Sequence, residues 1–497
     1  MSAGRHNYSF YKGFHSDNAL DFSKRSSFDR DVMLERVYPR RLILPMCQHY
    51  GDECVPVVKP GETVTIGQCI GAPAPGTMAV PVHSGISGTV TDIRPIVLPD
   101  DTTCKAVFIE GDRKRTFHPS VRPRNNVNVS AATVMGIIRD AGIVGMGGEG
   151  IPTIVKLNRA KRFKVKELLV NCLQSEPYAD SDYLMICEYA DHVIMGAVAM
   201  AGACGVRIIN ILISKDRKNE ITALRSAMER TFSKYSGYAF NLIYLKPRFP
   251  QGYYRMVARA LYGVNLDEGE GLEGRCRAVM FNCSTVYACW NAIAESMPLC
   301  SRTVSISTED GLLRNVIAPI GTPVSELFDT VNGISTTSKT IVWGNCFTGI
   351  QIDNPDVTPI IKTTSGVCLI TKIQDATAPC IGCGRCADVC PMGLEPDKLY
   401  RLINEGHESA AVKFNAGRCI NCSACSYICP SNINVGHAVG MFAAAKRRKS
   451  SFPYTAVGDR QWVDDISLLS ADTVKAAEKK IQKSDSLTLP FEGWESE

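Results

Sequence analysis

Two runs of cysteines in the last quarter of the chain have the spacing of iron–sulfur ligands. Each run reads C-x2-C-x2-C-x3-C-P, and in this spacing the fourth cysteine ligates the other of two [4Fe–4S] clusters. We therefore predict that the first cluster is held by cysteines from both runs, Cys380, Cys383, Cys386 and Cys429. The second cluster would be held by the other four, Cys390, Cys419, Cys422 and Cys425. Two clusters side by side pass single electrons, so the module is predicted to carry electrons.

Structural zinc and disulfide bonds are the two other common uses of grouped cysteines. Structural zinc sites usually combine two short clips from separate segments, whereas here four candidate ligands end in Cys-Pro and the arrangement is repeated. Iron–sulfur ligands must also stay reduced. The remaining thirteen of the 21 cysteines occur singly, most of them in apolar runs, as Cys204 and Cys368 do. We expect them to be buried, inert thiols.

The elements around the cysteines predict a ferredoxin-like 2x[4Fe–4S] module over residues 366–446. Pro391 and Pro430 turn the chain away after each fourth ligand, because proline fixes its backbone angle and lacks an N–H. A helix-like stretch follows each proline, at 395–403 and at 434–445. The two halves are therefore expected to form a pseudo-twofold pair.

Length and composition indicate an ordinary protein of several domains. At 497 residues the chain is long enough for roughly three or four domains, and its 45% hydrophobic and 21% charged residues are typical of soluble proteins. A formal net charge of +5 gives no reason to expect nucleic acid as a partner. No apolar signal region is visible at the start, and the longest uncharged stretches, 192–206 and 278–294, fall short of a membrane span. We expect a cytoplasmic chain that is not itself integral to a membrane.

The first quarter of the chain predicts an arm followed by a small β-domain. Residues 1–40 are polar, charged and aromatic without a clear period, and we interpret them as an extended arm. Short valine-rich runs separated by Pro-Gly and Ser-Gly turns follow over 41–118, and this pattern is similar to the barrel-sandwich hybrid of biotinyl and lipoyl carriers. The turn that would carry a modified lysine reads His83-Ser84-Gly85. We therefore predict a structural barrel-sandwich β-domain and not a swinging-arm carrier.

Residues 119–295 alternate between helical and buried-strand patterns. Such alternation is typical of a parallel sheet with helices on its faces, so we predict a Rossmann-like α/β domain. The expected helices are 132–141, 190–204, 220–234 and 282–291, and the expected strands are 167–171, 207–214 and 241–245.

A glycine-rich loop at the entrance of this domain is a candidate cofactor site. Its glycines are Gly145, Gly147, Gly148 and Gly150, and glycine lets the backbone approach a phosphate or a flat ring. Lys156 could then meet a phosphate. A glycine-rich turn is as often purely structural, and Glu149 in the same loop would repel an anionic ligand. Both interpretations stay open on these residues alone.

Two further segments flank the cysteine module. Strand patterns at 302–306 and 314–317, followed by a short helix, predict a β-grasp domain over 296–365. Residues 447–497 form a polar carboxy-terminal tail that begins in a basic run, either a solvated terminus or a docking site for a partner or a membrane surface. The expected fold class is a multidomain combination of α/β and α+β units.

The order of these domains resembles the C subunit of the Rnf ion-translocating oxidoreductases, also called Rsx. The resemblance covers residues 40–446 and rests on the motifs PMCQH, AGIVG, PT, SEP, FPQG, IGTP and CADVCPMG, at 45–49, 141–145, 152–153, 175–177, 249–252, 320–323 and 386–393. The central domain is similar to the flavin subunit of respiratory complex I.

The resemblance implies a flavin-containing electron-transfer subunit. The central domain would bind FMN and accept hydride from NADH, and the clusters would pass the electrons on. Beside the four glycines, the positions that match flavin or nucleotide contacts are Lys156, Asn171, Glu176 and Asn282. The chain would be a peripheral subunit on the cytoplasmic face of the inner membrane. Its partners would be other membrane and peripheral subunits, with a ferredoxin or flavodoxin as a further carrier.

The sequence departs from the family pattern around the expected flavin site. Where the family has Gly-Gly-Ala-Gly-Phe-Pro, this chain has Glu149 in place of the alanine, and where it has Asn-Gly-Ala-Glu-Cys-Glu-Pro, this chain has Cys172 and Gln174. A Glu-Lys pair is replaced by residues 253–255 (Tyr-Tyr-Arg), and a Gly-Gly-Pro-Met run by residues 344–349. Glu149 adds bulk and negative charge where a phosphate or a flavin face should fit.

Three functions are compatible with these residues. The first is an electron-input subunit of an Rnf-type complex, in which FMN takes two electrons as hydride and releases them singly. The second is an iron–sulfur relay and scaffold in the same complex, without a working nucleotide site. The third is a soluble reductase of a cobalamin-type cofactor, since a fold alone does not fix the partner.

Overall fold

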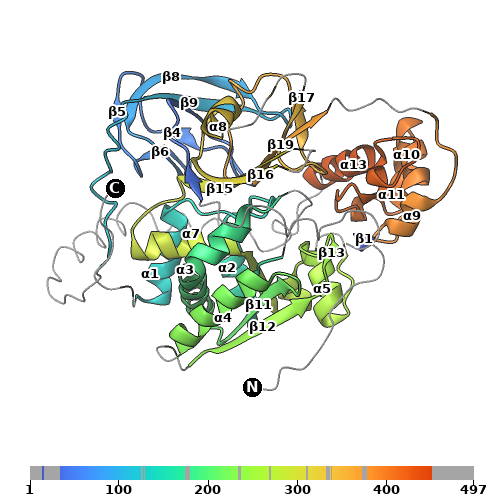
Figure 1. The fold of residues 1–497 in the computed structure, drawn as a ribbon, viewed down its shortest axis with the longest axis horizontal. Coiled ribbons are helices and arrows are strands. Elements are labelled where there is room, and N and C mark those ends of the chain that lie inside the picture. The colour runs from blue at the N-terminus through green and yellow to red at the C-terminus, as the bar shows by residue number, and fades with distance from the viewer. Residues whose placement is uncertain are drawn as a thin grey trace.

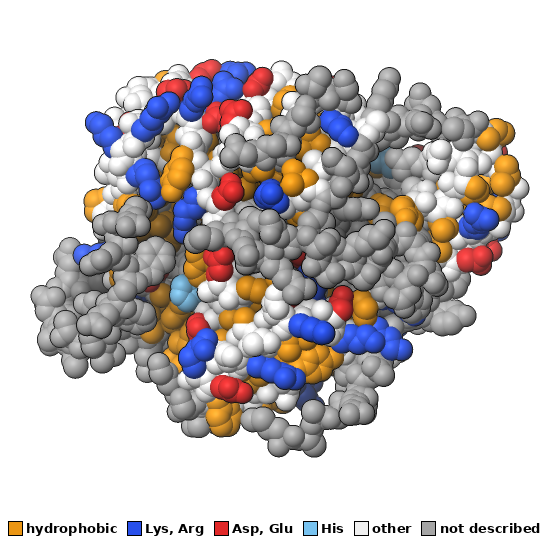
Figure 2. All heavy atoms as spheres, viewed as in Figure 1, with side chains coloured by type: hydrophobic (Ala, Val, Ile, Leu, Met, Phe, Trp, Pro, Cys, Tyr) orange, Lys and Arg blue, Asp and Glu red, His pale blue; other side chains and the backbone are white. Residues whose placement is uncertain are grey.

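The protein comprises four parts that follow one another along the chain (Figure 1). The computed structural model describes residues 14–15, 34–124, 127, 129–173, 179–232, 235, 237–267, 270–308, 312–331, 336, 339–371 and 378–449. Glu176, Gln174, most of the predicted arm and the tail beyond 449 lie outside these ranges. On the face drawn in Figure 2, acidic and basic side chains are interspersed, which agrees with the small net charge.

The first part consists of two small β-sheets that face each other. One sheet has the order β3 (Arg41–Pro45), β9 (Thr103–Gly111), β8 (Gly88–Val97) and β5 (Thr63–Val64), and the other contains β4 (Val55–Pro56), β6 (Cys69–Ala72) and β7 (Val82–His83). Leu42, Ile70 and Val90 are fully buried between them. His83 is buried as well, and burial lowers its pKa to about 3. A turn with a buried side chain cannot act as a swinging arm, so the structure supports the prediction of a structural β-domain.

The second part contains a sheet of four parallel strands, which confirms the parallel sheet that the alternating pattern predicts. Its order is β12 (Ala239–Leu245), β11 (Ile208–Ser214), β10 (Glu167–Asn171) and β14 (Ala278–Asn282). The helices are α1 (Ala131–Asp140), α2 (Thr153–Arg162), α3 (Ser181–Cys204), α4 (Lys218–Phe232), α5 (Tyr254–Tyr262), α6 (Leu272–Arg275) and α7 (Cys283–Ala294). Leu168 and Val170 point into one apolar core and Leu169 into another, so both faces of the sheet are covered.

Helix α3 is longer than the sequence predicts. It begins at Ser181 rather than at 190, and its backbone is non-helical at Tyr189, where two helical stretches join. With 24 residues and a mean hydropathy of 1.4 it has the length and composition of a membrane span, but 56% of that stretch is buried inside the protein. A Cβ on Gly196 would lie 2.3 Å from the Val286 carbonyl oxygen, which shows how closely α3 and α7 pack. Helix α3 is therefore a core helix of this part.

The third part is a six-stranded mixed sheet with α8 (Val324–Thr330) packed on it. The strand order is β18 (Ile350–Ile352), β17 (Lys339–Trp343), β19 (Gly366–Thr371), β15 (Ser301–Thr308), β16 (Leu313–Pro319) and β2 (Glu35–Arg36). Strand β2 lies within the predicted arm and β19 within the predicted cluster module, yet both pair into this sheet. The strand pattern of each segment is local, whereas its pairing with β16 or β15 is long-range and cannot be read from the segment itself.

One pair of cysteines in this sheet corrects the expectation of inert thiols. Cys346 follows β17 and Cys368 lies in β19, and the two form a disulfide. Strands β17 and β19 are antiparallel neighbours, and the chain folds back after Trp343, which brings the two sulfur atoms together. The other described cysteines are not disulfide-bonded.

The fourth part is the helical cysteine module, drawn in orange and red in Figure 1. Its elements are α9 (Arg385–Val389), α10 (Pro396–Asn404), α11 (Glu408–Lys413), η2 (Ala416–Arg418), α12 (Ala424–Tyr427) and α13 (Val435–Lys449). Met256 of α5 belongs to the same apolar core as Cys390, Leu399 and Val435. The α/β part thus contributes a side chain to the core of the module. Beside this contact, β1 (Phe14–His15) pairs with β13 (Arg248–Phe249).

Lys362 fastens the first three parts to one another. It follows β18 and is completely buried, and its Nζ donates to the carbonyl oxygens of Pro81 at 2.6 Å and Gly142 at 2.8 Å. Burial lowers its pKa to about 8. Hydrogen bonds from a buried ammonium group are strong. Lys362 therefore helps to hold the first three parts together.

Candidate functional site

A large cleft lies where the α/β part, the mixed sheet and the cysteine module meet. Its volume is about 1460 Å³. The α/β part contributes Gly145–Glu149, Lys156, Asn171–Leu173 and Asn282, the mixed sheet contributes residues 343–345 and 348–350, and the module contributes Arg418, Ile420 and Asn421. The carboxyl ends of parallel strands commonly form ligand sites, and here the ends of β10 and β14 form part of the lining.

The glycine-rich loop forms one wall of this cleft. Its ends are joined by backbone hydrogen bonds, from Gly145 N to Ile151 O at 2.8 Å and from Gly150 N to Gly145 O at 3.2 Å. Gly147 and Gly148 are exposed along the cleft. Gly150 does not face the cleft: its φ is +66°, and a Cβ there would lie 2.9 Å from the Thr363 side chain. Glycine at this position allows the loop to close, and a direct contact of Gly150 with a cofactor stays a prediction.

Lys156 lies on the cleft floor. Its Nζ donates to the Met280 carbonyl oxygen at 2.5 Å and lies 5.0 Å from the centre of the Phe281 ring. This places a positive charge at the end of β14, within the cleft that the glycine loop borders.

The two predicted asparagines occupy equivalent ends of adjacent strands. Asn171 and Asn282 are paired in register. The Asn171 amide donates to Gly252 O at 2.9 Å and accepts from Leu173 N at 3.1 Å. Asn282 caps α7 by accepting from Ser284 N at 2.9 Å. Both amides therefore shape the cleft floor through contacts within the chain.

Sequence reasoning missed Asp182, which organises the floor beside Asn282. Its carboxylate accepts from Asn282 Nδ2 at 2.9 Å and from the Ser284 hydroxyl. The thiol of Cys283 is fully buried and interacts with Asp182 and with Cys172, and burial, followed by these contacts, raises its pKa well above the usual value. Asp182 lies in the first turn of α3, which begins before the helix predicted at 190–204, so its position could not be anticipated.

A largely buried ion network in the cleft lining was also missed. Arg217 Nη1 lies 3.0 Å from Asp180 Oδ2 and 3.3 Å from Glu220 Oε1. Burial alone would lower the pKa of Arg217, but the two carboxylates raise it above its usual value. Burial raises the pKa of Glu220 to about 7 despite the opposing effect of Arg217. All three side chains line the cleft, although they are distant from the glycine loop in sequence.

Glu149 lies in the cleft wall, where the sequence places it, and is exposed. Its charge is therefore partly screened by water. Any repulsion of an anionic ligand by Glu149 is weaker than it would be in a dry site.

The structure brings together both crossed sets of cysteines. Cys380, Cys383, Cys386 and Cys429 line one small cavity at the surface, together with Asp397, Tyr400 and Ile433. Cys422 is buried next to the other three members of the second set, Cys390, Cys419 and Cys425. Burial raises the pKa of Cys422 well above its usual value, and that of Cys425 to about 12. The ligand roles remain predictions, and the grouping is the one that the C-x2-C-x2-C-x3-C spacing predicts.

The donor sets fit iron–sulfur clusters. Backbone amides point at two of the sulfurs, from Leu394 N to Cys390 Sγ and from Asn421 N to Cys419 Sγ, both at 3.4 Å. Such bonds stabilise cluster thiolates. Within the described ranges, no three His, Cys, Asp or Glu side chains converge as ligands of a single metal ion. A cubane separates its four thiolates more widely than one ion does, so this finding bears on a zinc ion and not on a cluster.

Comparison with known families agrees with this arrangement. Residues 8–114 match the RnfC barrel sandwich hybrid domain, residues 138–291 the Nuo51 FMN-binding domain, and residues 379–433 the 4Fe-4S dicluster domain. The C subunit of the ion-translocating oxidoreductase complex of Rhodobacter capsulatus is 31% identical over 385 residues, which cover 76% of this chain and 72% of the relative. The chain belongs to the RnfC family. This confirms the family that the sequence motifs indicate.

Two further members of the RnfC family have more specific names. The C subunit of the proton-translocating ferredoxin:NAD(+) oxidoreductase complex of Clostridium ljungdahlii is 31% identical over 82% of this chain and 87% of its own length. The C subunit of the Na(+)-translocating ferredoxin:NAD(+) oxidoreductase complex of Acetobacterium woodii is 30% identical over 72% of this chain and 80% of its own length. Among solved structures, an NAD+-reducing [NiFe]-hydrogenase aligns over 76% of this chain and 70% of its own, with 15% identity and a TM-score of 0.49, a likeness that decides nothing here.

The matching family models indicate two kinds of cofactor, FMN and iron–sulfur clusters. The protein has an FMN-binding domain and a 4Fe-4S dicluster domain. The cleft fits FMN, since it offers a glycine wall without side chains at Gly147 and Gly148, a positive charge at Lys156 and polar amides at the strand ends. Glu149 is the one lining residue of the glycine loop that opposes a phosphate.

Proposed function

We propose that this chain is the electron-input subunit of a membrane-bound, ion-translocating oxidoreductase of the Rnf type. The observation that carries the proposal is the shape of the cleft, which extends from the glycine loop to the loop of Arg418, Ile420 and Asn421. In that second loop, Arg418 directly precedes Cys419, and Ile420 and Asn421 lie between Cys419 and Cys422, two predicted ligands of the second cluster. A flavin in the cleft would therefore lie beside a cluster.

The residues of the cleft have separate tasks in this function. Bound FMN accepts two electrons as hydride, here from NADH, and releases them singly. Gly147 and Gly148 let the backbone approach the cofactor, and Lys156 offers a charge for its anionic part. Asn171 and Asn282 hold the floor, and Arg255 of α5 fixes the module to the cleft through a hydrogen bond from its Nη1 to Arg418 O at 3.0 Å.

The surroundings of the two clusters suggest the order of electron transfer. The second cluster is buried beside the cleft and would be reduced first. The first cluster is at the surface, where Cys380, Ile381 and Cys383 are exposed, and it would deliver electrons to a partner. Other membrane and peripheral subunits of the complex are the proposed partners, and the proposed location is the cytoplasmic face of the inner membrane.

Glu149 favours a second candidate function within the same complex. If its charge prevents stable flavin binding, the chain is an iron–sulfur relay that takes electrons from a ferredoxin or flavodoxin. No described feature of the cleft favours the third hypothesis, a soluble reductase of a cobalamin-type cofactor.

Anaerobic mixing of FMN-loaded protein with NADH tests the proposal. Flavin absorbance should bleach first, and cluster signals in electron paramagnetic resonance (EPR) spectra should follow. A protein whose clusters are reduced by a flavodoxin but never by NADH would be the relay instead. Clusters that stay oxidised although the flavin is fully reduced would contradict both functions.

A further inference from the structure

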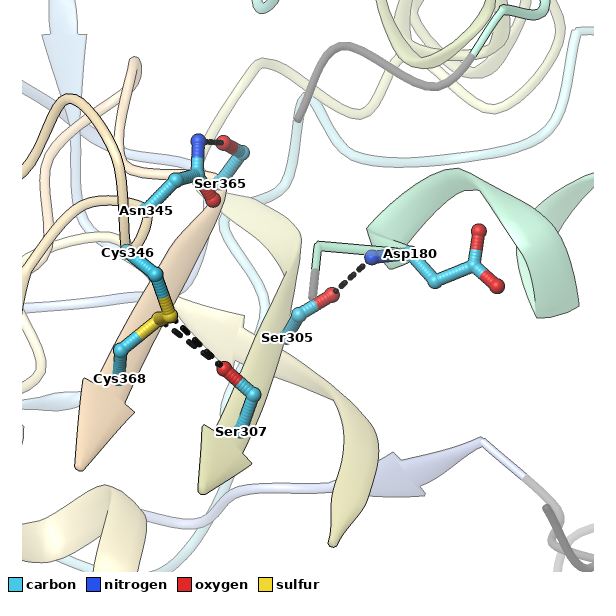
Figure 3. The surroundings of a disulfide bond; sticks show 7 residues. All are labelled: Asp180, Ser305, Ser307, Asn345, Cys346, Ser365 and Cys368. Carbon is cyan, nitrogen blue, oxygen red and sulfur yellow. Dashed lines mark hydrogen bonds between the residues drawn. A yellow bond between two sulfur atoms is a disulfide. The ribbon is translucent and has the colours of Figure 1, made fainter. Parts of the chain in front are cut away.

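A disulfide in the mixed sheet holds a loop that lines the cleft (Figure 3). It joins Cys346 to Cys368, 22 residues apart, and their Cα atoms are 5.7 Å from each other. The hydroxyl of Ser307 is 3.0 Å from Cys368 Sγ and 3.9 Å from Cys346 Sγ. Cys368 is buried, whereas Cys346 is partly exposed and can be reached by a reagent.

The loop that the disulfide fastens belongs to the cleft. This loop, residues 344–349, follows β17, and Gly344, Asn345, Thr348 and Gly349 line the cleft. The disulfide is the covalent link between the loop and β19. A change at the bridge therefore acts directly on the wall of the cofactor cleft.

The same loop covers the second cluster site. The Phe347 ring, one residue after Cys346, lies 5.5 Å from the Phe249 ring and 5.3 Å from the Tyr427 ring of α12. It packs on an apolar core that contains Phe249 and Cys422. Phe347 therefore shields a predicted ligand of the second cluster from water.

We propose that Cys346 and Cys368 form a reversible thiol–disulfide site that controls how firmly this loop covers the second cluster. The reductant is a dithiol. One of its thiolates attacks Cys346 Sγ to form a mixed disulfide, and Cys368 Sγ leaves and takes up a proton. The second thiol of the reductant then displaces Cys346, which is also protonated. The reductant ends as a disulfide, and two electrons have passed to the protein.

Three features favour a reversible bridge over a fixed one. The other described cysteines are not disulfide-bonded, and iron–sulfur ligands persist only under reducing conditions, in which protein disulfides are usually transient or redox-sensing. The Ser307 hydroxyl can donate to the departing Cys368 thiolate. Noncovalent contacts also hold the loop, from Gly344 N to Gly366 O at 3.0 Å and from Asn345 Nδ2 to Ser365 Oγ at 3.1 Å. These contacts keep the thiols near each other, so the bridge can form again.

Opening of the bridge should change the second cluster, a consequence that rests on the proposed function. With the loop less firmly held, Phe347 covers Cys422 less completely and water approaches the cluster. Solvent exposure is one of the factors that set cluster potentials. Water stabilises the more negative, reduced cluster, so its reduction potential should rise.

Thiol labelling of the whole chain tests the bridge independently of any cluster. Protein is equilibrated anaerobically in mixtures of reduced and oxidised dithiothreitol, alkylated, and analysed by peptide mass spectrometry. We expect Cys346 and Cys368 to change together from unlabelled to labelled over a narrow range of ratios, and to return on reoxidation. A bridge that stays closed in full reductant, or two thiols that stay labelled in full oxidant, would overturn the proposal.

EPR-monitored redox titration tests the effect on the second cluster. Wild-type protein is compared in its bridged and reduced states, with Cys346→Ser as a permanently open variant and Cys187→Ser, a half-buried cysteine of α3, as the matched control. The reduced wild type and Cys346→Ser should share a potential above that of the bridged wild type and the control. Equal potentials in bridged and reduced wild type would overturn the coupling, even if the variant does not fold. Absence of cluster signals from every sample would overturn the proposed function, while labelling still decides the bridge.

Discussion

The two cluster sites have the same cysteine spacing and opposite surroundings. In the first, Cys380 and Cys383 are exposed, and the neighbouring Ile381 side chain is 65% exposed. In the second, Cys390 and Cys422 are buried. Phe249 and Met256 of the α/β part pack around the second site, whereas the cavity of the first is lined by the module alone. The spacing determines which thiols meet, and the parts packed around them determine which cluster meets solvent.

This difference suggests a direction for the electron path. A cluster shielded from water beside a cofactor cleft is suited to receive electrons, and a cluster at the surface is suited to pass them to another protein. The predictions below test whether the two sites differ as their surroundings indicate.

Removal of Cys390 should have the largest effect. We expect anaerobically prepared wild-type protein to contain about eight irons, and Cys390→Ala to lose the second cluster and fall toward about four. Cys390 follows the first three cysteines in sequence but is grouped with Cys419, Cys422 and Cys425 in space. Iron analysis and EPR spectra measure the loss.

Cys429→Ala is the matched control for this variant and should remove the first cluster instead. If Cys390→Ala abolished the signal of the first cluster and kept that of the second, the crossed ligation would be wrong.

The exposed cluster should be destroyed faster than the buried one. A small oxidant such as ferricyanide reaches Cys380 and Cys383 directly, whereas it must pass Phe249 and Phe347 to reach the second site. We expect the EPR signal of the first cluster to disappear several-fold faster than that of the second. Freeze-quenched EPR measures the two rates. In Phe347→Ala, the difference between these two rates should be smaller. Equal rates in the wild type would show that the surroundings do not protect the second cluster.

Local spacing and long-range packing explain how much of this could be predicted from the sequence. The grouping of the eight cysteines in space was predictable because it follows from two short segments and one fixed geometry. The alternating apolar runs were enough to predict the parallel sheet. The start of α3 was not, because its first turn is polar and the helix is interrupted at Tyr189. Asp182 was missed for that reason.

The disulfide and the buried ion network could not be predicted for a different reason. Cys346 and Cys368 meet only because β17 and β19 are neighbours in a sheet whose order is set by long-range pairing. Arg217, Asp180 and Glu220 meet at the ends of separate elements. The glycine loop is local in sequence, and Gly147, Gly148 and Glu149 all line the cleft; their contact with a cofactor stays a prediction.

Variants of Glu149 test how the charge of this residue affects FMN binding in the cleft beside the second cluster. Two like charges ~4 Å apart repel by about 4 kcal/mol at an effective dielectric of 20 and by about 1 kcal/mol in water. Because Glu149 is exposed, we expect a value between these limits, on the order of tenfold in FMN affinity. Glu149→Gln removes the charge and keeps the size, and Glu149→Ala removes both.

Fluorescence titration of flavin-free protein with FMN measures this effect. Both variants should bind FMN more tightly than the wild type. Added salt should reduce this difference in affinity, since salt screens exposed charges. Tighter FMN binding should also speed the reduction of the clusters by NADH. The signal of the second cluster should appear before that of the first. Full FMN occupancy in the purified wild type, with no gain in either variant, would show that Glu149 does not weaken the site.

The smallest expected effect concerns the pH range in which the two cluster sites can be compared. His49 and His83 lie in the β-domain, far in sequence from both clusters. Burial, followed by the charge of Lys362, lowers the pKa of each to about 3. Below pH 6.5 the unfolded chain therefore takes up protons that the folded chain does not. The free energy of unfolding should fall as the pH drops from about 6.5 toward 3, by about 2 kcal/mol per histidine at pH 5.

Denaturant unfolding of the cluster-free protein at pH 7.5 and 5 can isolate this contribution. His83→Gln should be less stable than the wild type at pH 7.5, because a flexible amide replaces a rigid ring in a packed core, but it should lose about 2 kcal/mol less on acidification. His437→Gln, at an exposed position, should behave as the wild type does. If His83→Gln lost as much stability as the wild type, the buried histidine would not govern the acid limit. If the prediction holds, loss of both clusters together in acid reports unfolding of the protein. Only differences between the two clusters that are measured above pH 6.5 then report their different surroundings.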